Sequence, residues 1–308
     1  MDIQYLDSET WNNYLEGSIY QTAFHNAFLI EAFVQELGGK ATLCLVTEGS
    51  KAWLTPVFQG CPWNQGEEYF STSSVGYGGP LALHRIVDTY RERLEIQKCL
   101  QALEIHLKRN FYRGTLYPFP GWVGQINDHI SETLVIVQMN LNAAFTFGQI
   151  ITGNARTAIR RAKKSGVTTK LVETEKELDS AFQLILNTQR SVSANYATPY
   201  SLIQRLHVDK TLNAELRIAV VENDIVGAVM LLKHKIHSFH WLHGWDKSYG
   251  KFCGNQLLIW SMMQTCMNQG CPTLNLGASH TPEQKRAKER WGAVSMPILN
   301  VYGKQNLS

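Results

Sequence analysis

The sequence lacks any long apolar run. Nowhere in its 308 residues do about 18 consecutive apolar residues occur, which is the length that a membrane-spanning helix needs. The N-terminus, Met1 to Gln4, also lacks the basic region and apolar stretch of a signal peptide. We therefore predict no transmembrane segment and expect a cytoplasmic protein.

A strong charge balance and a cysteine framework are missing as well. Lys and Arg number 29 against 26 Asp and Glu, so the net charge of +3 does not by itself indicate DNA or an anionic membrane as a partner. The six cysteines include no C-x-x-C pair, and a chain of this length needs no disulfides to fold. We expect reduced, mostly buried thiols and no DNA partner.

Several catalytic and cofactor motifs are absent. There is no P-loop and no G-x-S-x-G element, and the glycines at 76–79 do not form G-x-G-x-x-G between a strand and a helix. Histidines recur at 234, 237, 240 and 243, but the last three fall on a predicted strand over 236–243, where successive members point to opposite faces. One zinc ion cannot reach such a set, so no metal site is predicted.

The sequence does contain the same order of elements twice. Each half has apolar, β-branched runs separated by a short polar turn, which is typical of a β-hairpin, and then a helix and a short strand. In the first half these are 41–47, 51–58, 94–108 and 115–117; in the second they are 216–221, 225–232, 236–243, 257–267 and 274–276. The offset of about 175 residues favours a duplicated domain over a solenoid repeat.

A helix precedes each hairpin. The first covers Asn26 to Leu37, and the second opens at Thr174 with Glu177 three residues later, which is a capping-box pattern. We predict two α+β domains, residues 1–143 and 144–308, with mixed, mainly antiparallel sheets flanked by helices. The boundary is expected near 140–148, and a single irregular α+β domain is the alternative.

Two segments of the second half resemble a known family. The segment 273–279, a short strand and a polar turn, is followed by the basic helix that contains Lys288 and by Trp291-Gly292. This order resembles a DFG-S-type turn followed by FK-x-x-(F/W)-G in the FemAB-like branch of the GNAT acyltransferases. The amphipathic segment 154–166, with five cations on its outer face, is similar to the NxRxxIRRAxKxGV segment of the same branch. The resemblance implies two tandem GNAT-like domains and an acyltransferase activity.

The resemblance also indicates catalytic candidates. Lys288 occupies the position of the motif lysine, which in the family lies near the donor. Asp246 ends the run 241–246, which resembles a GxSD-like turn, and its carboxylate could orient or deprotonate the acceptor amine. An Asp in a turn also caps backbone N–H groups, and that structural role is the alternative.

Binding candidates are predicted in four segments. The loop 249–256 precedes a helix and could present N–H groups to a phosphate, although the coenzyme A signature is degenerate, which favours another donor. The segment 190–200 is similar to the acceptor-contacting loop of the family, and the glycine turn near 78 has a counterpart there; an ordinary loop and a structural turn are the alternatives. The donor-binding candidates are Lys251, Gly254, Asn255, Ser279 and Lys285, and the acceptor-binding candidates are Arg190, Tyr196, Tyr200, Tyr77 and Gly78.

The resemblance implies a FemAB-like transferase in peptidoglycan biosynthesis. It would move an aminoacyl group from aminoacyl-tRNA to an amine of a cell-wall precursor or a related small acceptor, with no tightly bound cofactor and with peripheral membrane contact allowed. One alternative is an acyl-CoA-dependent N-acyltransferase. A non-catalytic binding protein is another, because Asn275 and Ala287 replace the usual Asp and Phe.

Overall fold

The computed structural model describes most of the chain, and the chain divides into two compact units. The described residues are 1–61, 70–71, 76–108, 111–116, 133–140, 151–192, 197–279 and 281–302. Unit 1 comprises Met1–Val135 and Met296–Ser308, and unit 2 comprises Ile136–Ser295. The predicted boundary at 143/144 lies outside the described residues.

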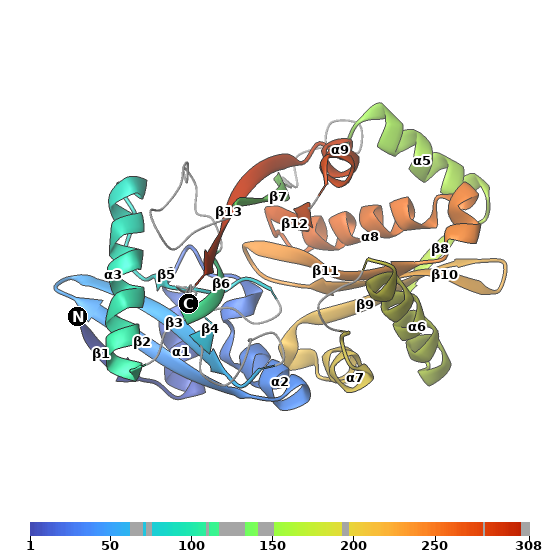
Figure 1. Cartoon of the computed structure of the whole chain (residues 1–308). Coiled ribbons are helices and arrows are strands. Elements are labelled where there is room, and N and C mark those ends of the chain that lie inside the picture. The colour runs from blue at the N-terminus through green and yellow to red at the C-terminus, as the bar shows by residue number, and fades with distance from the viewer. Residues whose placement is uncertain are drawn as a thin grey trace, which may run out of the picture. The chain divides into compact units, whose positions relative to one another are not determined.

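Unit 1 is built on a sheet in the order β1-β2-β3-β4-β6-β13, with β5 paired to β3 (Figure 1). Its elements are β1 (Asp2–Tyr5), α1 (Ser8–Glu16), α2 (Ala27–Leu37), β2 (Lys40–Glu48), β3 (Lys51–Gln59), β4 (Phe70–Ser71), β5 (Leu81–Ala82), α3 (Thr89–Leu107), β6 (Phe111–Leu116) and β13 (Val294–Tyr302). The β2–β3 hairpin confirms the first predicted hairpin, and Gly49 takes the positive φ of +59° that its tight turn requires.

The last strand of the chain returns to unit 1. β13 pairs antiparallel with β6, with Leu299 opposite Leu116 and Tyr302 opposite Arg113. The sheet of unit 1 therefore contains strands from both ends of the sequence.

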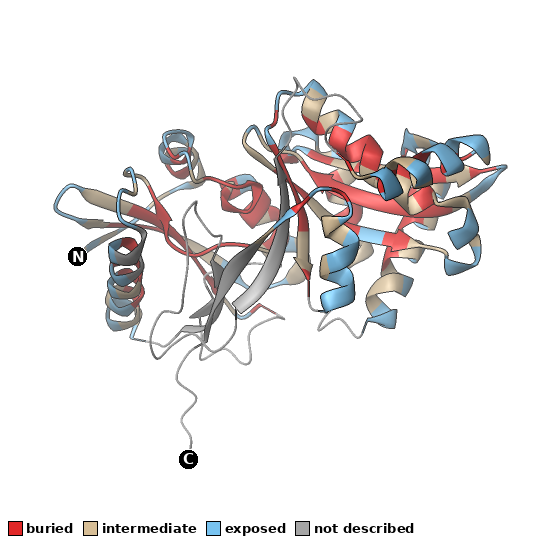
Figure 2. Ribbon diagram, turned by 90° about the horizontal axis from the view of Figure 1, so that it is seen from above, coloured by how far each residue is buried: buried red, intermediate tan, exposed pale blue. Residues whose placement is uncertain are grey.

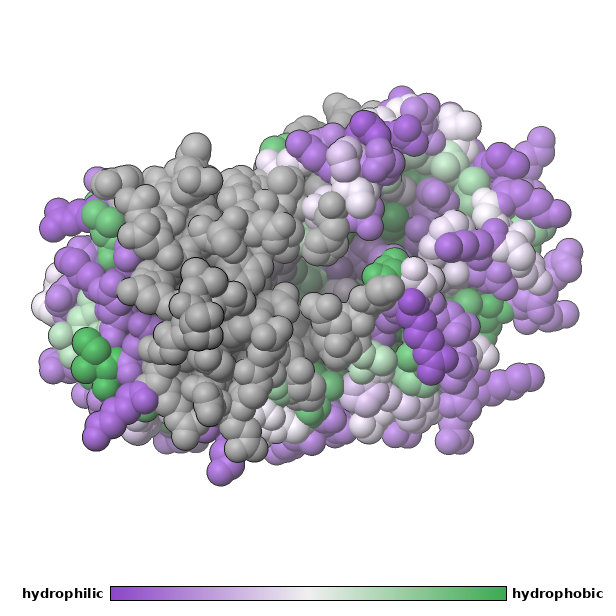
Figure 3. Space-filling model, viewed as in Figure 1, coloured by the Kyte–Doolittle hydropathy of each residue, from purple (hydrophilic) through white to green (hydrophobic). Residues whose placement is uncertain are grey.

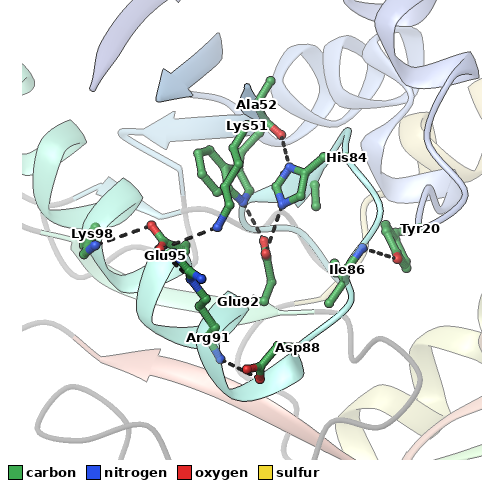
Figure 4. Close-up of polar contacts among 12 residues, drawn as sticks. Tyr20, Lys51, Ala52, His84, Ile86, Asp88, Arg91, Glu92, Glu95 and Lys98 are labelled. Atoms are coloured by element: carbon green, nitrogen blue, oxygen red, sulfur yellow. Dashed lines mark hydrogen bonds and ion pairs between the residues drawn. The ribbon is translucent and has the colours of Figure 1, made fainter. Parts of the chain in front are cut away.

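A buried ionic network attaches α3 to β3 (Figure 4). Glu92 is only 3% exposed, and its carboxylate accepts from Trp53 Nε1 at 2.7 Å and lies 3.0 Å from His84 Nε2. His84 Nδ1 faces the carbonyl of Ala52 at 3.3 Å. Through these contacts the ring of His84 links the backbone of β3 to the carboxylate of Glu92 on α3.

One turn later, Glu95 is buried among cations. Its carboxylate lies 3.5 Å from Lys51 Nζ, 3.6 Å from Lys98 Nζ and 3.9 Å from Arg91 Nε. Burial alone raises the pKa of Glu95, but the charges of Lys51 and Lys98 outweigh it and hold that pKa below its usual range. Glu95 is thus matched to cations, although its Oε2 has no hydrogen-bond partner among the described residues.

The strands of unit 2 lie in the order β7-β12-β11-β10-β9-β8. Its elements are α5 (Gly153–Lys164), β8 (Thr168–Leu171), α6 (Glu175–Ser191), α7 (Tyr200–Val208), β9 (Ala214–Val221), β10 (Asp224–Leu232), β11 (His237–Trp245), α8 (Gly254–Asn268), β12 (Thr273–Ser279) and α9 (Pro282–Glu289), and β7 (Thr133–Asn140) spans the boundary between the units. The pairs β8–β9, β9–β10 and β10–β11 are antiparallel, whereas β11–β12 is parallel.

Helices cover both faces of this sheet. In Figure 1, α5 and α8 lie on one face and α6 and α7 on the other. Ala155, Ile159 and Ala162 of α5 pack into a core with α8 and with β9 and β10, as the amphipathic pattern predicts, and Figure 2 shows the central strands and much of α8 as buried. In the described part of the chain, no helix combines the length and apolarity that crossing a bilayer would need.

Helix ends follow the local sequence. Thr174 Oγ1 accepts from Glu177 N at 3.3 Å while Glu177 Oε2 accepts from Thr174 N at 3.3 Å, so the predicted capping box is confirmed. α5 ends shortly before Gly166, whose φ is +76°. α9 begins after Thr281, which accepts from Gln284 N at 3.2 Å.

Candidate active site

A β-bulge in β11 gathers two histidines. The register between β10 and β11 skips Trp241, so that His240 lies opposite Leu231 and His243 opposite Val229. Opposing residues share a face of a sheet, and both partners belong to the core beneath α8. The two imidazole rings therefore lie on one face, with centroids 5.1 Å apart. The expectation that successive histidines point to opposite faces is wrong for this pair, because a bulge shifts the alternation by one residue.

β11 and β12 form a fork beside this pair. Their backbone register runs from His237 opposite Thr273 to Phe239 opposite Asn275, although both strands continue further. At the end of the paired region, Asn275 Oδ1 accepts from Gly277 N at 2.7 Å and fixes a turn. The turn is thus held by an amide oxygen, as a carboxylate oxygen would hold it.

Lys288 of α9 reaches into the fork. Its Nζ donates to Gly277 O at 2.8 Å and to Ala278 O at 2.7 Å. A Cβ on Gly277 would lie 3.7 Å from His240 O and 3.9 Å from Lys288 Nζ, so these three residues meet at one point. Burial lowers the pKa of Lys288 to about 8. An ammonium group has three N–H donors, and two of them are used by the carbonyls.

Buried polar atoms without partners surround the fork. Among the described residues, His240 Nε2, Asn275 Nδ2 and Ser279 Oγ are inaccessible to solvent and have no hydrogen-bond partner. An unsatisfied buried polar group costs about 1–3 kcal/mol, and native proteins retain few of them. Three such atoms lie on two neighbouring strands beside Lys288, and this makes the fork a candidate site.

Both histidines are neutral bases at pH 7. Burial, followed by the nearby His243 and the charge of Lys288, places the pKa of His240 well below the ordinary value of 6.5. His243 is exposed, but the surrounding protein partly desolvates its ring, and this lowers its pKa. The positive charge of Lys288 lowers the pKa further. The fork therefore combines one ammonium with two uncharged imidazoles.

Asp246 follows directly after β11 and caps a short 3-10 helix, Lys247–Phe252. Its carboxylate accepts from Ser248 N at 2.9 Å and from Ser248 Oγ at 2.6 Å. These bonds lower the pKa of Asp246 and stabilise its charged form. The geometry gives Asp246 a capping role, and its role as a base stays a prediction.

The predicted donor loop leads into the N-terminus of α8. The residue before the helix, Cys253, has φ +59° and provides no side-chain cap, so the first N–H groups, those of Gly254 and Asn255 among them, have no partner within the helix. Lys251 lies over the ring of Phe252, with its Nζ 4.9 Å from the ring centroid. Free N–H groups and a cation together suit an anion.

Two other donor candidates differ in their surroundings. Ser279 ends β12 close to the Gly277–Ala278 carbonyls that hold Lys288, and its hydroxyl is one of the atoms without a partner. Lys285 instead lies 3.8 Å from Glu289 on its own helix. The structure brings Ser279 and Lys288 together at the fork.

The acceptor candidates of unit 2 are on its other face. Arg190 is exposed in the last turn of α6, where a cation suits the helix C-terminus. Tyr200 begins α7 and bonds to Asp179, which raises the pKa of Tyr200 to about 12. Tyr196 lies outside the described residues. Neither Arg190 nor Tyr200 is among the groups around Lys288.

The two remaining acceptor candidates belong to unit 1. Tyr77 is 7% exposed and packs edge-on against Phe24, with ring centroids 5.6 Å apart, and Gly78 beside it is buried. Gly76 has no room for a side chain, because a Cβ there would lie 2.2 Å from the ring of Phe24. This explains the glycine turn as a packing requirement of unit 1.

His240 and Gly277 were not predicted as site residues from the sequence. The recurring histidines were considered only as metal ligands, and within the part of the chain that the structure describes no three His, Cys, Asp or Glu side chains are grouped to hold a metal ion. The sequence pattern that could have indicated His240 was a predicted strand with several histidines in the same half of the chain as the basic helix of Lys288. The bulge that turns them to one face leaves no reliable mark in a single sequence.

Comparisons with known proteins agree with this fold. Residues 152–285, less than half of the chain, match the family model of the acetyltransferase (GNAT) domain. The crystal structure of FemX has a TM-score of 0.67 at 11% identity and covers 98% of this chain and 97% of FemX. No curated protein matches.

Two further solved structures align over nearly the whole chain. The C-terminal domain of a putative lysylphosphatidylglycerol synthetase from Agrobacterium fabrum has a TM-score of 0.57 at 11% identity and covers 97% of this chain and 92% of that one. A tandem GNAT protein from the clavulanic acid biosynthesis pathway has a TM-score of 0.54 at 10% identity, with coverage of 99% and 100%. The predicted FemAB-like, tandem GNAT fold is thereby confirmed.

Proposed function

We propose that this chain is an aminoacyltransferase that moves an aminoacyl group from aminoacyl-tRNA to the amine of a cell-wall precursor or a related small acceptor. The observation that carries the proposal is Lys288, whose ammonium is fixed by two carbonyls in a fork of unpartnered polar atoms. The match of unit 2 to the GNAT domain supports a transferase, and the fold shared with FemX supports the aminoacyl form.

The chemistry is attack of an amine on an activated ester. A nitrogen–carbon bond forms, negative charge develops on the carbonyl oxygen, and the bond to the carrier oxygen then breaks. Lys288 supplies a positive charge and a third N–H donor to that oxygen, and its existing bonds hold it in place before the reaction. Preorganised donors of this kind stabilise a transition state more than a ground state.

The surface of α5 favours a polyanionic donor. Arg160, Arg161, Lys163 and Lys164 are exposed, and α5 contains no acidic residue. Thr152 Oγ1 donates to Arg290 O, so the start of α5 adjoins the end of α9, and Figure 3 shows hydrophilic residues over this region. Clustered cations neutralise phosphates and release counterions, which supports tRNA as the donor carrier.

An acyl-CoA donor is the second candidate. The uncapped N-terminus of α8 and Lys251 together suit a pyrophosphate. The structure of the tandem GNAT protein of similar fold is that of the form without AcCoA, so AcCoA is a ligand considered for that protein. A coenzyme A thioester is therefore the alternative donor for this chain.

Equilibrium binding tests the choice of donor. Labelled aminoacyl-tRNA is titrated with the protein at about 50 and 200 mM salt, a range over which phosphate contacts weaken strongly. We expect salt-dependent binding that acetyl-CoA does not displace and that the double variant Arg160→Glu/Arg161→Glu loses. Lys176→Glu, an exposed residue of α6, is the matched control. Binding of acetyl-CoA without tRNA would move the assignment to the second candidate.

Turnover tests the non-catalytic alternative. Asn275 still fixes the Gly277 turn, and Ala287 is exposed on α9, so neither replacement removes the fork. We expect transfer to an amine acceptor from at least one of the two donors. No turnover with either donor would favour a binding protein. Cytoplasmic location and peripheral membrane contact stay predictions.

A further inference from the structure

Resting on the proposed transfer reaction, we propose that His240 is the general base that removes a proton from the attacking amine, and that His243 passes this proton to solvent. Neither histidine resembles a motif position, and the assignment comes from the bulge in β11. The two residues of the fork then have different roles: Lys288 stabilises the oxyanion, and His240 accepts the proton of the amine.

The position of His240 supports the assignment. It is the first residue of β11 beyond the stretch paired with β12, and its carbonyl lies 3.7 Å from the Cβ position of Gly277, beside Lys288 Nζ. Its Nε2 is enclosed and has no partner among the described residues. An amine bound at the fork would give this nitrogen the partner that it lacks among the described residues.

The charge environment keeps His240 in its basic form. α8 and β12, which pack against β11, contain no Asp, Glu, Lys, Arg or His, and α6 covers the opposite face. The charged or titratable groups that act on His240 are His243 of β11 and Lys288 of α9, and both lower its pKa in addition to burial. Across the neutral range the imidazole is therefore uncharged and can accept a proton.

A weak base suits this reaction. A free amine attacks the ester carbonyl, and as the nitrogen–carbon bond forms the nitrogen becomes cationic and its N–H acidic. His240 Nε2 takes that proton, the carbon–oxygen bond to the carrier breaks, and the leaving oxygen takes one proton from solvent. The proton on His240 leaves through His243, so an amine and an ester become an amide and an alcohol, and no redox partner is needed.

His243 is suited to the second step. Its ring centroid is 5.1 Å from that of His240, and it is exposed, so it joins an enclosed nitrogen to water. The positive charge on nearby Lys288 discourages either histidine from retaining the proton. The base is thus returned to its neutral form after each transfer.

Histidine 15N NMR tests the assignment without turnover. The spectrum of His240→Gln identifies the signals of His240 by their loss. We expect Nε2 to be unprotonated at pH 7, and the imidazole to titrate below pH 6.5. A proton on Nε2, or titration at or above pH 6.5, would overturn the proposal. If the wild type turns over no donor, the proposed function fails, whereas the tautomer still decides whether His240 can be a base.

Kinetics with the active donor test the role directly. We expect His240→Gln to lower kcat/KM by roughly 100-fold or more and to remove the acid limb of its pH profile. His240→Gly should regain activity when imidazole is added, because a diffusible base replaces the missing one. His237→Gln, on the same strand, is the control and should keep wild-type activity. Retained activity in His240→Gln, or an equal loss at every pH without rescue of His240→Gly, would show a structural role only.

Discussion

His84 in unit 1 and His240 in unit 2 each lie beside a sheet and a charged helix side chain, but the charges are opposite. His84 meets the carboxylate of Glu92 from α3, and both of its nitrogens face acceptors. The pKa of His240 is instead lowered by burial, by His243 and by the charge of Lys288 from α9, and its Nε2 has no partner among the described residues. The ring of His84 is thus bound within the protein, whereas burial and the positive charge of Lys288 keep the ring of His240 neutral.

This difference separates a structural polar cluster from a reactive one. Both carboxylate oxygens of Glu92 have partners within the protein, so they attach α3 to β3. The fork in unit 2 leaves three polar atoms unsatisfied and holds a lysine whose pKa is reduced to about 8. Unsatisfied groups and displaced pKa values are typical of functional sites.

Removing the cation should have the largest effect. Lys288→Met keeps the length of the side chain but loses the oxyanion donor, so we expect kcat/KM to fall roughly 100- to 1,000-fold while the fold persists. Arg286→Met on the same helix, which changes an exposed cation paired with Glu283, is the control. Steady-state kinetics and circular dichroism measure both. Similar activity in the two variants would remove Lys288 from the mechanism.

Breaking the structural cluster should affect stability instead. Glu92→Ala leaves Trp53 Nε1 and His84 buried without their acceptor, so we expect the free energy of unfolding to fall by about 3 kcal/mol. Gln101→Ala changes an exposed residue on the same helix, and we expect it to lower the free energy of unfolding by less than about 0.5 kcal/mol. Urea unfolding followed by tryptophan fluorescence gives both values. An unaffected midpoint in Glu92→Ala would mean that the network does not stabilise unit 1.

The pH dependence of kcat/KM should show the ionisation of Lys288. Its ammonium is present below its pKa, so kcat/KM should decline as the pH rises through about 8, and Lys288→Arg should move that limb to higher pH. The unfolded chain, in which the lysine pKa returns toward 10.5, binds more protons between pH 8 and 10.5. Stability should therefore decrease as the pH is lowered through that window. An alkaline limb unchanged in Lys288→Arg would assign it to another group.

Asp246→Asn should have the smallest effect. An asparagine can still accept from Ser248 N as a cap, so we expect kcat/KM to change by less than about threefold and stability by less than about 1 kcal/mol. Activity and thermal unfolding measured beside His240→Gln compare the two candidate bases. A hundredfold loss in Asp246→Asn would make Asp246 the base and contradict the assignment of His240.

The local features of the fold were predictable from the sequence. The hairpin β2–β3, the strands β9 to β11, the capping box at Thr174 and the end of α5 before Gly166 all depend on residues that are close in the chain. Lys288 was predicted because a motif marked it, and its burial and bonds agree with a special position.

The remaining features depend on distant residues. The return of β13 to β6 joins residues far apart in the sequence, and neither segment shows which partner it will take. The bulge at Trp241 is set by how β11 fits β10, and it decided where the histidines point. The cap formed by Asp246 and the bond from Tyr200 to Asp179 likewise became visible only with the neighbouring backbone in place.

The route of β13 has a consequence for synthesis on the ribosome. Because β13 borders β6, the sheet of unit 1 lacks its last strand while all of unit 2 is being made, a delay of roughly 8–30 s at the usual rates of translation. During that time β6 is an open edge that can pair with another chain. Loss of β13 would accordingly damage unit 1, most of which is synthesised before unit 2, and the nascent chain needs protection at β6 until β13 has been synthesised.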